Sequence, residues 1–466
     1  MDYRIERDFL GEKQVPADVY WGIHTQRARE NFSLSGSRMI QGIIVAYAMV
    51  KKACGTANRE LGFLNPSVAD AIVAACDEII VGRLQDQFPL DPFQGGAGTS
   101  LNMNLNEVIA NRAEELLAGK RGDYLLVHPL DHVNLHQSTN DTFPTAVKVA
   151  VIYKLRALSG VLATLQGALQ NKEKEFAGIV KMGRTELQEA VPMTLGSQFS
   201  GFAEAVGRDR WRTFKCEERI RTVNLGLTAV GTGICAPREY IFLVVDKLRE
   251  LTGMGLSRAE NGVDQTSNAD AFAEIAGILN ACAVNLMKIA NDLRLLNLIG
   301  EIHVEALQAG SSIMPAKTNP VILESIVQVA MRVMSNGGMI VNAASAGTQQ
   351  INEFMPLISH GILESLDLLI NSSKSAVGCI STITAHEDVC RKFVDFSPSM
   401  MTAFVPVIGY QKTQELIREY KTQQSAGSVR DFLKSKMDAR VVDEVLSPHK
   451  LAALGFNTDE SKHINT

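Results

Sequence analysis

Residues 272–296 read FAEIAGILNACAVNLMKIANDLRLL, and the spacing of their apolar side chains predicts the fold class. Apolar residues recur at alternating intervals of three and four positions: Phe272, Ile275, Leu279, Cys282, Leu286, Ile289, Leu293 and Leu296. This repeat places their side chains on one face of an α-helix, the face by which a helix packs in a bundle. The stretch therefore predicts a long amphipathic helix that packs against other helices.

Proline placement predicts where further long helices run. The chain has 14 prolines, and none occurs in 145–191, 193–236 or 238–314. Because proline costs ~3 kcal/mol inside a helix, these gaps are where long helices can form. The first gap carries a similar apolar repeat from Ala146 to Leu165. A helix of about 30 residues is ~45 Å long, which exceeds what a compact domain needs. We therefore expect an all-α chain whose elongated bundle packs beside copies from other subunits.

The length of the chain predicts several domains. Its 466 residues exceed the ~250–300 at which single hydrophobic cores stop growing. Apolar residues make up 46% of the chain and charged residues 21%, the balance of a folded protein. We expect three regions, with loops and shorter helices in 1–137, the long-helix bundle in 138–394 and a small helical region in 395–466.

Charge and cysteine usage exclude several classes of function. The net charge is −5 and no run of lysine or arginine resembles a phosphate-binding surface, which argues against nucleic acid or an anionic membrane as a partner. The N-terminal segment lacks the apolar stretch of a signal peptide, and the longest apolar runs are far shorter than the ~20 residues of a transmembrane helix. The seven cysteines form no CxxC pair. These features predict a cytoplasmic protein without a disulfide framework or a cysteine zinc site.

A glycine-rich segment interrupts the helical pattern early in the chain. Residues 94–104 read QGGAGTSLNMN. Closely spaced glycines let the backbone approach a ligand, and Thr99 supplies a hydroxyl group. His132 and His136 follow at a spacing that suits a metal on a helix, but no further ligand set stands nearby in the sequence. We therefore predict no metal site.

A hydroxyl run, residues 137–144, reads QSTNDTFP. Capping of the following helix accounts for one of its polar residues, for which we expect Asp141 or Thr142. It leaves Ser138, Thr139 and Asn140 unexplained. Such residues at a helix N-terminus form an anion pocket, because they add hydroxyl and amide donors to the unpaired backbone N–H groups and the positive end of the helix dipole.

Two later segments complete the polar set. Residues 183–192 read GRTELQEAVP, and residues 310–320 read GSSIMPAKTNP. In the second segment Lys317 offers a positive charge and Asn319 an amide, while Ser311 or Ser312 can act as a base if loop N–H groups stabilise its alkoxide. Many hydroxyl, amide and ammonium donors without a metal or a cysteine nucleophile suit a small dicarboxylate. They predict a lyase that works through a carbanion with serine as the base.

These segments resemble the signatures of the fumarase/aspartase superfamily. GSSIMPAKTNP is similar to that family's GSSxMPxKxNP, and QGGAGTSLNMNLNEVIANR, QSTNDTFPTA and GRTxLQxAVP occur in the same order. The opening RIERDFLGEKQVPADVYWGIHTQRARENF also looks like the family's first segment, so the resemblance spans nearly the whole chain. Within the superfamily it is closer to aspartate ammonia-lyases than to class II fumarases, since the glycine-rich loop reads GGAGTS rather than TGSGTQ.

The resemblance implies a fold, an assembly and a reaction. The fold is three-domain and all-α, and its long helices form the twenty-helix core of a homotetramer whose active sites draw loops from three subunits. The reaction is the reversible anti elimination of ammonia from L-aspartate to give fumarate, through an aci-carboxylate carbanion and without a cofactor.

The resemblance also implies roles for individual residues. Ser311 matches the base that removes the Cβ proton. The carboxylate that becomes the aci-carboxylate is held by Thr99, Ser138, Thr139 and Ser312. The other carboxylate is held by Thr185, Lys317 and Asn319. Asn140, together with Thr99, faces the leaving amine.

Two departures from the family pattern concern the leaving-group side. Glu186 stands where relatives have the histidine of GRTH near the substrate's amino group, so we count Glu186 among the substrate-binding residues. The segment 295–310, LLNLIGEIHVEALQAG, is several residues shorter than the SGPRxGLxE stretch of relatives. The family's NxMEP also reads NEFMP at 352–356.

These departures leave alternatives open. The alternative enzyme releases fumarate from a bulkier N- or S-succinyl amino acid adduct, for example S-(2-succino)cysteine, whose ammonium Glu186 would bind. A class II fumarase and a non-catalytic homologue are further hypotheses. The intact set of Ser311, Lys317 and Asn319 argues against a non-catalytic homologue.

Overall fold

The computed structural model describes residues 2–423 and 427–455, and its secondary structure is predominantly helical. The predicted all-α class is confirmed, because the strands of the described part form only small two-stranded sheets. The longest elements are five helices: α5 (Thr139–Glu175), α6 (Leu195–Ile220), α9 (Asp270–Leu298), α10 (Val321–Ser345) and α11 (Met355–Ser381).

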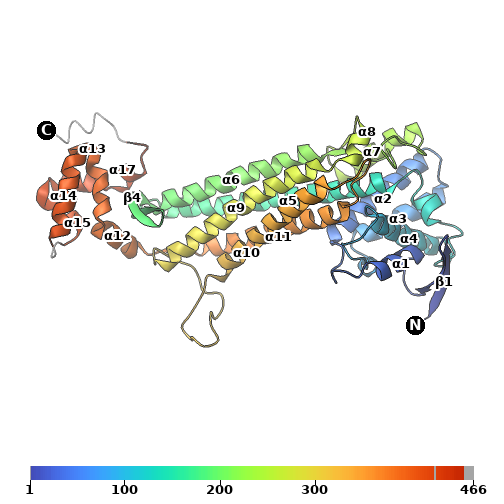
Figure 1. The fold of residues 1–466 in the computed structure, drawn as a ribbon, viewed down its shortest axis with the longest axis horizontal. Helices are drawn as coiled ribbons and strands as arrows, with labels where there is room; N and C mark the ends of the chain where they lie inside the picture. The colour runs from blue at the N-terminus through green and yellow to red at the C-terminus, as the bar shows by residue number, and fades with distance from the viewer. Residues whose placement is uncertain (1, 424–426, 456–466) are drawn as a thin grey trace. The chain divides into compact units, whose positions relative to one another are not determined.

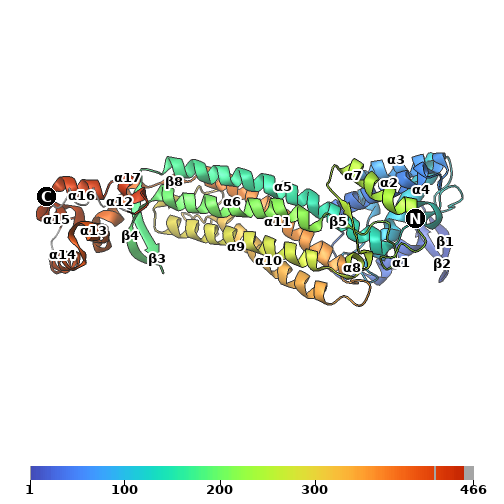
Figure 2. The same cartoon turned by 90° about the horizontal axis from the view of Figure 1, so that it is seen from above.

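The chain divides into two compact units, and each contains a part of every long helix. The first unit comprises Met1–Ser159, Trp211–Ala283 and Met331–Ile370, and the second comprises Gly160–Arg210, Val284–Ala330 and Asn371–Thr466. In each unit the parts of these helices lie side by side (Figures 1 and 2). The three sequence regions stay a prediction, and 424–426 and 456–466 of the third lie outside the described residues.

In the first unit a group of shorter elements surrounds the helical parts. They are β1 (Tyr3–Asp8), β2 (Gly11–Pro16), α1 (Ile23–Asn31), α2 (Gln41–Glu60), α3 (Pro66–Ile80), η1 (Gln85–Gln87), α4 (Thr99–Leu116), η2 (Pro129–Val133), β5 (Thr222–Val223), α7 (Arg238–Thr252), β6 (Ser257–Arg258) and α8 (Gly262–Ser267). Helix α2 packs against both α3 and α7. Many apolar residues of α2 are buried by this packing. Lys51 is buried as well, although a lysine on an amphipathic helix is expected at the surface.

In the second unit a hairpin and a cluster of short helices accompany the helical parts. These elements are β3 (Val180–Thr185), β4 (Gln188–Thr194), β7 (Ile302–His303), β8 (Thr384–Ala385), α12 (Glu387–Phe396), η3 (Pro398–Phe404), α13 (Val405–Ile408), α14 (Tyr410–Thr422), α15 (Val429–Lys436), α16 (Ala439–Val445) and α17 (Pro448–Ala452). The short helices share a core that includes Met400, Phe404 and Leu433. Met182 of the hairpin belongs to the same core.

The apolar repeat in residues 272–296 is confirmed as a packing face. All of its side chains, from Phe272 to Leu296, are at most 5% exposed. In the second unit Leu286 packs near Leu165, Leu169 and Ile380 of the neighbouring helices. The repeat is therefore already buried within a single chain, and its burial needs no other subunit.

Helix α9 is long and apolar enough to cross a membrane by length and composition alone. An 18-residue window within its 29 residues has a mean hydropathy of 1.4, and 44% of that window is buried. The search for uninterrupted apolar runs in the sequence did not find this segment. Asn280 and Asn285 interrupt its apolar runs, although the helix as a whole remains apolar. Core helices of soluble proteins have the same length and composition, and the buried repeat gives α9 that role here.

Candidate functional site

The glycine-rich loop is held against the start of α5. Gly98 has a φ of 94° and precedes Thr99, the first residue of α4. A Cβ atom added to Gly98 would lie 2.5 Å from the ring of Phe143, so only glycine permits this approach. Because Phe143 belongs to α5, the contact brings Thr99 to the N-terminal end of that helix. Thr99 itself is half-buried.

The N-terminus of α5 is capped by Ser138 and Asp141 together. The Ser138 hydroxyl accepts the N–H of Asn140 at 3.2 Å, and the Asp141 carboxylate accepts the N–H of Ser138 at 3.0 Å. This arrangement resembles a capping box, except that the hydroxyl accepts the N–H of the residue two positions later and not three. Our prediction named Asp141 or Thr142 as the capping residue. Asp141 does take part, but Ser138, which the prediction left outside the cap, takes part as well. Ser138 accepts one bond in this role, and among the described residues we find no acceptor for its hydroxyl proton, so this proton can be donated to a ligand.

Asn140 owes its position to Pro144, which lies inside α5. Proline has no N–H to donate to the carbonyl four residues earlier, and that carbonyl belongs to Asn140. The side-chain amide of Asn224 donates to it instead, at 2.9 Å. The Asn140 amide donates in turn to the Ala229 carbonyl at 2.7 Å. Within residues 2–423 and 427–455 no donor contacts the amide oxygen of Asn140, so this oxygen can accept from a ligand such as an amine.

Thr139 is joined to α4 by a side-chain hydrogen bond. The amide of Asn102 donates to the Thr139 hydroxyl at 2.9 Å, and both residues are buried. The structure thus brings Thr99, Ser138, Thr139 and Asn140 to adjoining segments of the first unit. The sequence offered Asn102 as an amide of the glycine-rich segment without a partner, and the structure gives it Thr139 as its partner. Asn102 and Asn106 lie four positions apart and so share one face of α4.

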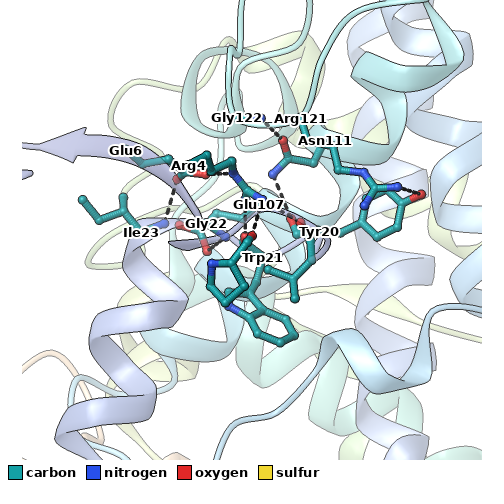
Figure 3. A network of polar contacts seen from close by, with 12 residues as sticks. Arg4, Glu6, Tyr20, Trp21, Gly22, Ile23, Glu107, Asn111, Arg121 and Gly122 are labelled. Atoms are coloured by element: carbon teal, nitrogen blue, oxygen red, sulfur yellow. Dashed lines mark hydrogen bonds and ion pairs between the residues drawn. The ribbon is translucent and has the colours of Figure 1, made fainter. Parts of the chain in front are cut away.

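Helix α4 is anchored to the N-terminal segment by Glu107 (Figure 3). Its buried carboxylate accepts the N–H of Gly22 at 2.9 Å and the hydroxyl of Thr25 at 2.5 Å. Burial raises the pKa of Glu107 to about 7, and the nearby Glu6 carboxylate acts in the same direction. The anchor fixes the helix whose first residue is Thr99.

In the second unit Thr185 and Glu186 lie at the tip of the β3–β4 hairpin. The two turn residues Glu186 and Leu187 have φ values of 52° and 61°, and Thr185 pairs with Gln188 across the turn. Two-residue turns with both φ values positive favour asparagine and glycine. Glu186 and Leu187 are therefore held in a strained conformation, and both side chains are exposed at the tip.

A buried ion-pair cluster holds the base of this hairpin. Glu301, which is fully buried, pairs with Lys181 at 2.8 Å and with Arg184 at 2.7 Å. Burial lowers the pKa of Lys181, while the carboxylate of Glu301 opposes that shift. Glu301 lies in the shortened segment 295–310, so the cluster ties that segment to the strand that carries Thr185.

The loop 310–320 surrounds the Ser311 hydroxyl with backbone donors. The Ser311 oxygen accepts the N–H of Met314 at 2.9 Å and that of Ile313 at 3.2 Å. The Asn319 amide donates to the Gly310 carbonyl at 3.1 Å and closes the loop. Two N–H groups directed at one hydroxyl oxygen stabilise negative charge on it, which is what a serine base needs.

Two of the other predicted residues of this loop are open to solvent in the single chain. Ser312 and Lys317 are exposed, and Asn319 is half-buried. Among the described residues we find no hydrogen bond or ion pair of the Lys317 ammonium. Its charge is thus available for a ligand.

The predicted site residues therefore fall into two sets. Thr99, Ser138, Thr139 and Asn140 belong to the first unit, whereas Thr185, Glu186, Ser311, Ser312, Lys317 and Asn319 belong to the second. A groove of about 850 Å³ runs beside the hairpin in the second unit, and its lining includes Glu186, Leu187 and Arg208.

The two histidines considered as metal ligands have local partners. The ring of His132 accepts the N–H of His128 at 2.9 Å, and the ring of His136 contacts the Asn58 side chain at 2.7 Å. Burial lowers the pKa of both rings. Among residues 2–423 and 427–455 no group of three or more histidine, cysteine, aspartate or glutamate side chains converges on one point.

Comparison with known proteins places this geometry in a family. A family model described as lyase matches residues 11–335. The chain is 42% identical to an aspartate ammonia-lyase from Bacillus sp over 98% of both chains. It is 44% identical to an aspartate ammonia-lyase from Escherichia coli strain K12 over 87% of both chains.

Two solved structures share the fold. Fumarate lyase:delta crystallin from Brucella melitensis matches with a TM-score of 0.93 and 44% identity, over 97% of this chain and 100% of that chain. Class II fumarase from Schistosoma mansoni matches with a TM-score of 0.91 and 32% identity, over 97% of this chain and 99% of that chain. The resemblance seen in the sequence motifs is confirmed, and the chain belongs to this lyase family, the fumarase/aspartase superfamily.

Proposed function

We propose that the protein is an aspartate ammonia-lyase, which eliminates ammonia from L-aspartate to give fumarate. The observation that carries this proposal is the environment of Ser311, whose oxygen accepts two loop N–H groups. The relatives named aspartate ammonia-lyase support it, since they cover nearly the whole chain at about 42% identity.

The reaction begins with Ser311 as the base. Its oxygen removes the proton from the carbon next to one carboxylate, and the electron pair moves into that carboxylate to form the aci-carboxylate. The pair then returns to form the carbon–carbon double bond as the carbon–nitrogen bond breaks. Ammonia leaves, fumarate remains, and the proton stays on Ser311 until solvent accepts it.

The other predicted residues bind the two ends of the substrate. Donors that strengthen as charge accumulates lower the barrier more than donors that bind both states equally. The aci-carboxylate is assigned to Thr99, Ser138, Thr139 and Ser312. The second carboxylate is assigned to Thr185, Lys317 and Asn319. The amide oxygen of Asn140, with the Thr99 hydroxyl, accepts from the amine.

Assembly belongs to the same proposal. The site residues come from loops that the family combines across subunits, so we assign the protein a homotetrameric state with a twenty-helix core and shared active sites. Small dicarboxylates are its substrates, and the cytoplasm is its compartment. Helix α6 supports the assembly, because its Trp211 and Phe214 side chains are 64% and 65% exposed in the single chain.

A second candidate function follows from Glu186. Its carboxylate lies at the strained hairpin tip and lines the groove of about 850 Å³. A carboxylate beside a dicarboxylate substrate is repulsive unless the leaving group brings a positive charge to it. The one ammonium of L-aspartate is assigned to Asn140 and Thr99, whereas a succinyl adduct of an amino acid carries a further ammonium several atoms away. The groove offers volume for such an adduct.

Fumarate release from a panel of substrates separates the two candidates. The purified protein is incubated with L-aspartate, L-malate, an N-succinyl amino acid and S-(2-succino)cysteine, and fumarate is followed by its ultraviolet absorbance. The proposal predicts the highest kcat/KM with L-aspartate. A higher value with an adduct would assign the second function, and no fumarate from any substrate would contradict both.

A further inference from the structure

Lys51 is a buried cation that the mechanism above does not use. It lies on α2 and its side chain is fully buried. Its ammonium donates to two neutral groups, the amide oxygen of Asn134 at 3.0 Å and that of Gln137 at 2.8 Å. Among the described residues no hydrogen bond or ion pair joins it to a carboxylate. A buried charge without a paired carboxylate is costly, and a protein that keeps one calls for an explanation.

The side-chain amide of Asn134 links Lys51 to the hydroxyl run through a series of hydrogen bonds, which we call the relay. The Asn134 oxygen also accepts from the amides of Asn102 at 3.3 Å and Asn106 at 3.2 Å. Asn102 donates its other N–H to the Thr139 hydroxyl at 2.9 Å. The Asn134 oxygen thus accepts from three donors, namely Lys51, Asn102 and Asn106. The Lys51 ammonium polarises the Asn134 amide and so strengthens the network. Lys51 is thus two side chains away from a residue assigned to the aci-carboxylate.

The hydroxyl run is tied to Lys51 along a second path. Gln137, the other partner of the ammonium, directly precedes Ser138 in the chain. Its own amide donates to the Val133 carbonyl at 2.9 Å, which fixes the side chain. Both paths end at hydroxyl groups assigned to the same carboxylate of the substrate.

The other described groups around Lys51 do not form a hydrogen bond or an ion pair with its ammonium. The Tyr47 ring lies 5.5 Å from the ammonium, and the titratable groups that act on its pKa are Cys54, Asp141 and Cys76. The Asp141 carboxylate accepts the N–H groups of Ser138, Gly226 and Thr228, so backbone donors occupy it. It tempers the charge of Lys51 from a distance and does not form a hydrogen bond with it.

We infer that Lys51 is a positioning residue of the reaction, whose buried charge sets the Asn134–Asn102–Thr139 relay and favours negative charge on the carboxylate held by the hydroxyl run. The inference rests on the proposed function. It assigns to α2, far from the motif loops in sequence, a part in preparing the site for the aci-carboxylate. Preorganised charge of this kind acts most on the state in which negative charge has accumulated.

The expected size follows from Coulomb's law. Two unit charges roughly 10 Å apart at an effective dielectric constant of about 20 interact strongly enough for a tenfold to twentyfold effect. Burial lowers the pKa of Lys51 to about 8, so its charge is present below this pH and is lost above it. The contribution to kcat/KM should therefore decline as the pH rises through about 8.

Lys51→Met removes the charge, and Lys51→Gln removes it while keeping a polar group for the relay. The matched control is Lys148→Met. Lys148 is also buried, at 4% exposed, and its pKa is also lowered to about 8. Its ammonium donates to the Thr222 carbonyl and to Gln265, away from the relay. Three quantities are measured for each full-length protein: kcat/KM for L-aspartate between pH 6.5 and 9.5, the Kd of succinate by calorimetry, and the melting temperature.

Both Lys51 variants should lose tenfold to twentyfold in kcat/KM at neutral pH, with a smaller loss in succinate affinity and without the decline near pH 8. Lys148→Met should keep the wild-type kcat/KM, its pH profile and the wild-type Kd of succinate. If the Lys51 variants match Lys148→Met in kcat/KM and in pH profile, the inference is overturned and the lysine is only structural. If one Lys51 variant does not fold, the other decides.

Failure of the proposed function gives a different pattern. Wild-type protein that binds succinate but does not turn over L-aspartate contradicts the proposed function alone. In that case weaker succinate binding by Lys51→Gln than by Lys148→Met still supports the inference, and equal binding overturns it.

Discussion

Several single residues of this protein carry a charge in the buried interior, where neighbouring polar groups must form hydrogen bonds with it. Lys51 and Lys148 are buried lysines that donate to neutral oxygens, and Glu107 is a buried carboxylate surrounded by N–H and hydroxyl donors. Such groups are stable only while their partners are in place. They fix the polar loops of the first unit more firmly than apolar packing alone, because each charge has defined donors or acceptors.

Lys148 predicts a pH dependence of stability. Burial lowers its pKa from 10.5 to about 8 in the folded protein. Between these pH values the unfolded chain binds the proton and the folded chain does not, so the free energy of unfolding rises with pH, by up to ~3 kcal/mol for this group. Lys148→Met should reduce this increase in the free energy of unfolding by up to the same ~3 kcal/mol. Chemical denaturation at about pH 7 and pH 10 checks this, and an unchanged rise in the variant would refute the assignment.

Glu186 predicts a change in the preference for leaving groups. Glu186→His removes a carboxylate that a further ammonium of a bulkier leaving group can use, whereas the one ammonium of L-aspartate is assigned to Asn140 and Thr99. The ratio of kcat/KM for L-aspartate to that for a succinyl adduct should therefore rise at least fivefold, the scale of about one charge-assisted hydrogen bond. Glu186→Gln should weaken adduct binding most. Steady-state kinetics of the three proteins with both substrates test this. If the ratio does not change, Glu186 has no part in recognising the leaving group.

At the scale of elements, the hairpin β3–β4 combines a strained tip with a base fixed by buried charges. Glu186 and Leu187 both have positive φ values, while Glu301 pairs with Lys181 and Arg184 below them. Strain of this kind persists where surrounding contacts determine the backbone. The arrangement presents Thr185 and Glu186 in a fixed conformation before any ligand arrives.

The strain can be measured at Leu187. This residue is 74% exposed, so truncating its side chain removes little buried surface. Leu187→Gly relieves the left-handed conformation, whereas Leu187→Ala removes the same side chain and keeps the strain. The glycine variant should be more stable than the alanine variant by about 1 kcal/mol. Thermal unfolding compares the two, and an alanine variant at least as stable would show that the tip is unstrained.

The elements themselves could be predicted because their signals are local. Proline gaps and the apolar repeat of residues 272–296 are visible in sequence, and the structure contains α9 at Asp270–Leu298. The capping of α5 was predicted for Asp141 or Thr142, and the part that Ser138 plays in it was missed, although Ser138 and Asp141 stand three positions apart. The burial of Lys51 could not be predicted, since its partners Asn134 and Gln137 are more than 80 positions away.

At the scale of the whole molecule, motif order was sufficient to predict the family, and assembly was harder to predict. The apolar repeat that suggested packing between subunits is buried within one chain, because neighbouring helices of the same chain cover it. In the proposed tetramer, the loops that complete one active site depend on contacts between chains, and no pattern within one sequence encodes such contacts directly. The grouping of all the site residues into one active site therefore stays a prediction.

Exposed apolar side chains on α6 predict how assembly can be broken. Phe214→Glu places a charge on a surface that a second subunit covers in the proposed tetramer, so the variant should dissociate and lose activity together. Leu34→Glu is the matched control, because Leu34 is 69% exposed and Phe214 is 65% exposed. Light scattering with activity assays distinguishes the outcomes. An active monomer would contradict the shared site, and an intact tetramer would exclude this surface.

The most direct test of the proposed lyase compares the two serines of the loop 310–320. Ser311 is the proposed base and Ser312 a proposed carboxylate ligand, so the account predicts that Ser311→Ala lowers kcat by at least about a thousandfold while the Kd of succinate stays within a few fold. Ser312→Ala should act mainly on KM. Both variants should fold, because neither side chain belongs to the core. Near-wild-type kcat in Ser311→Ala would contradict the assignment of the base, and with it the mechanism proposed for this protein.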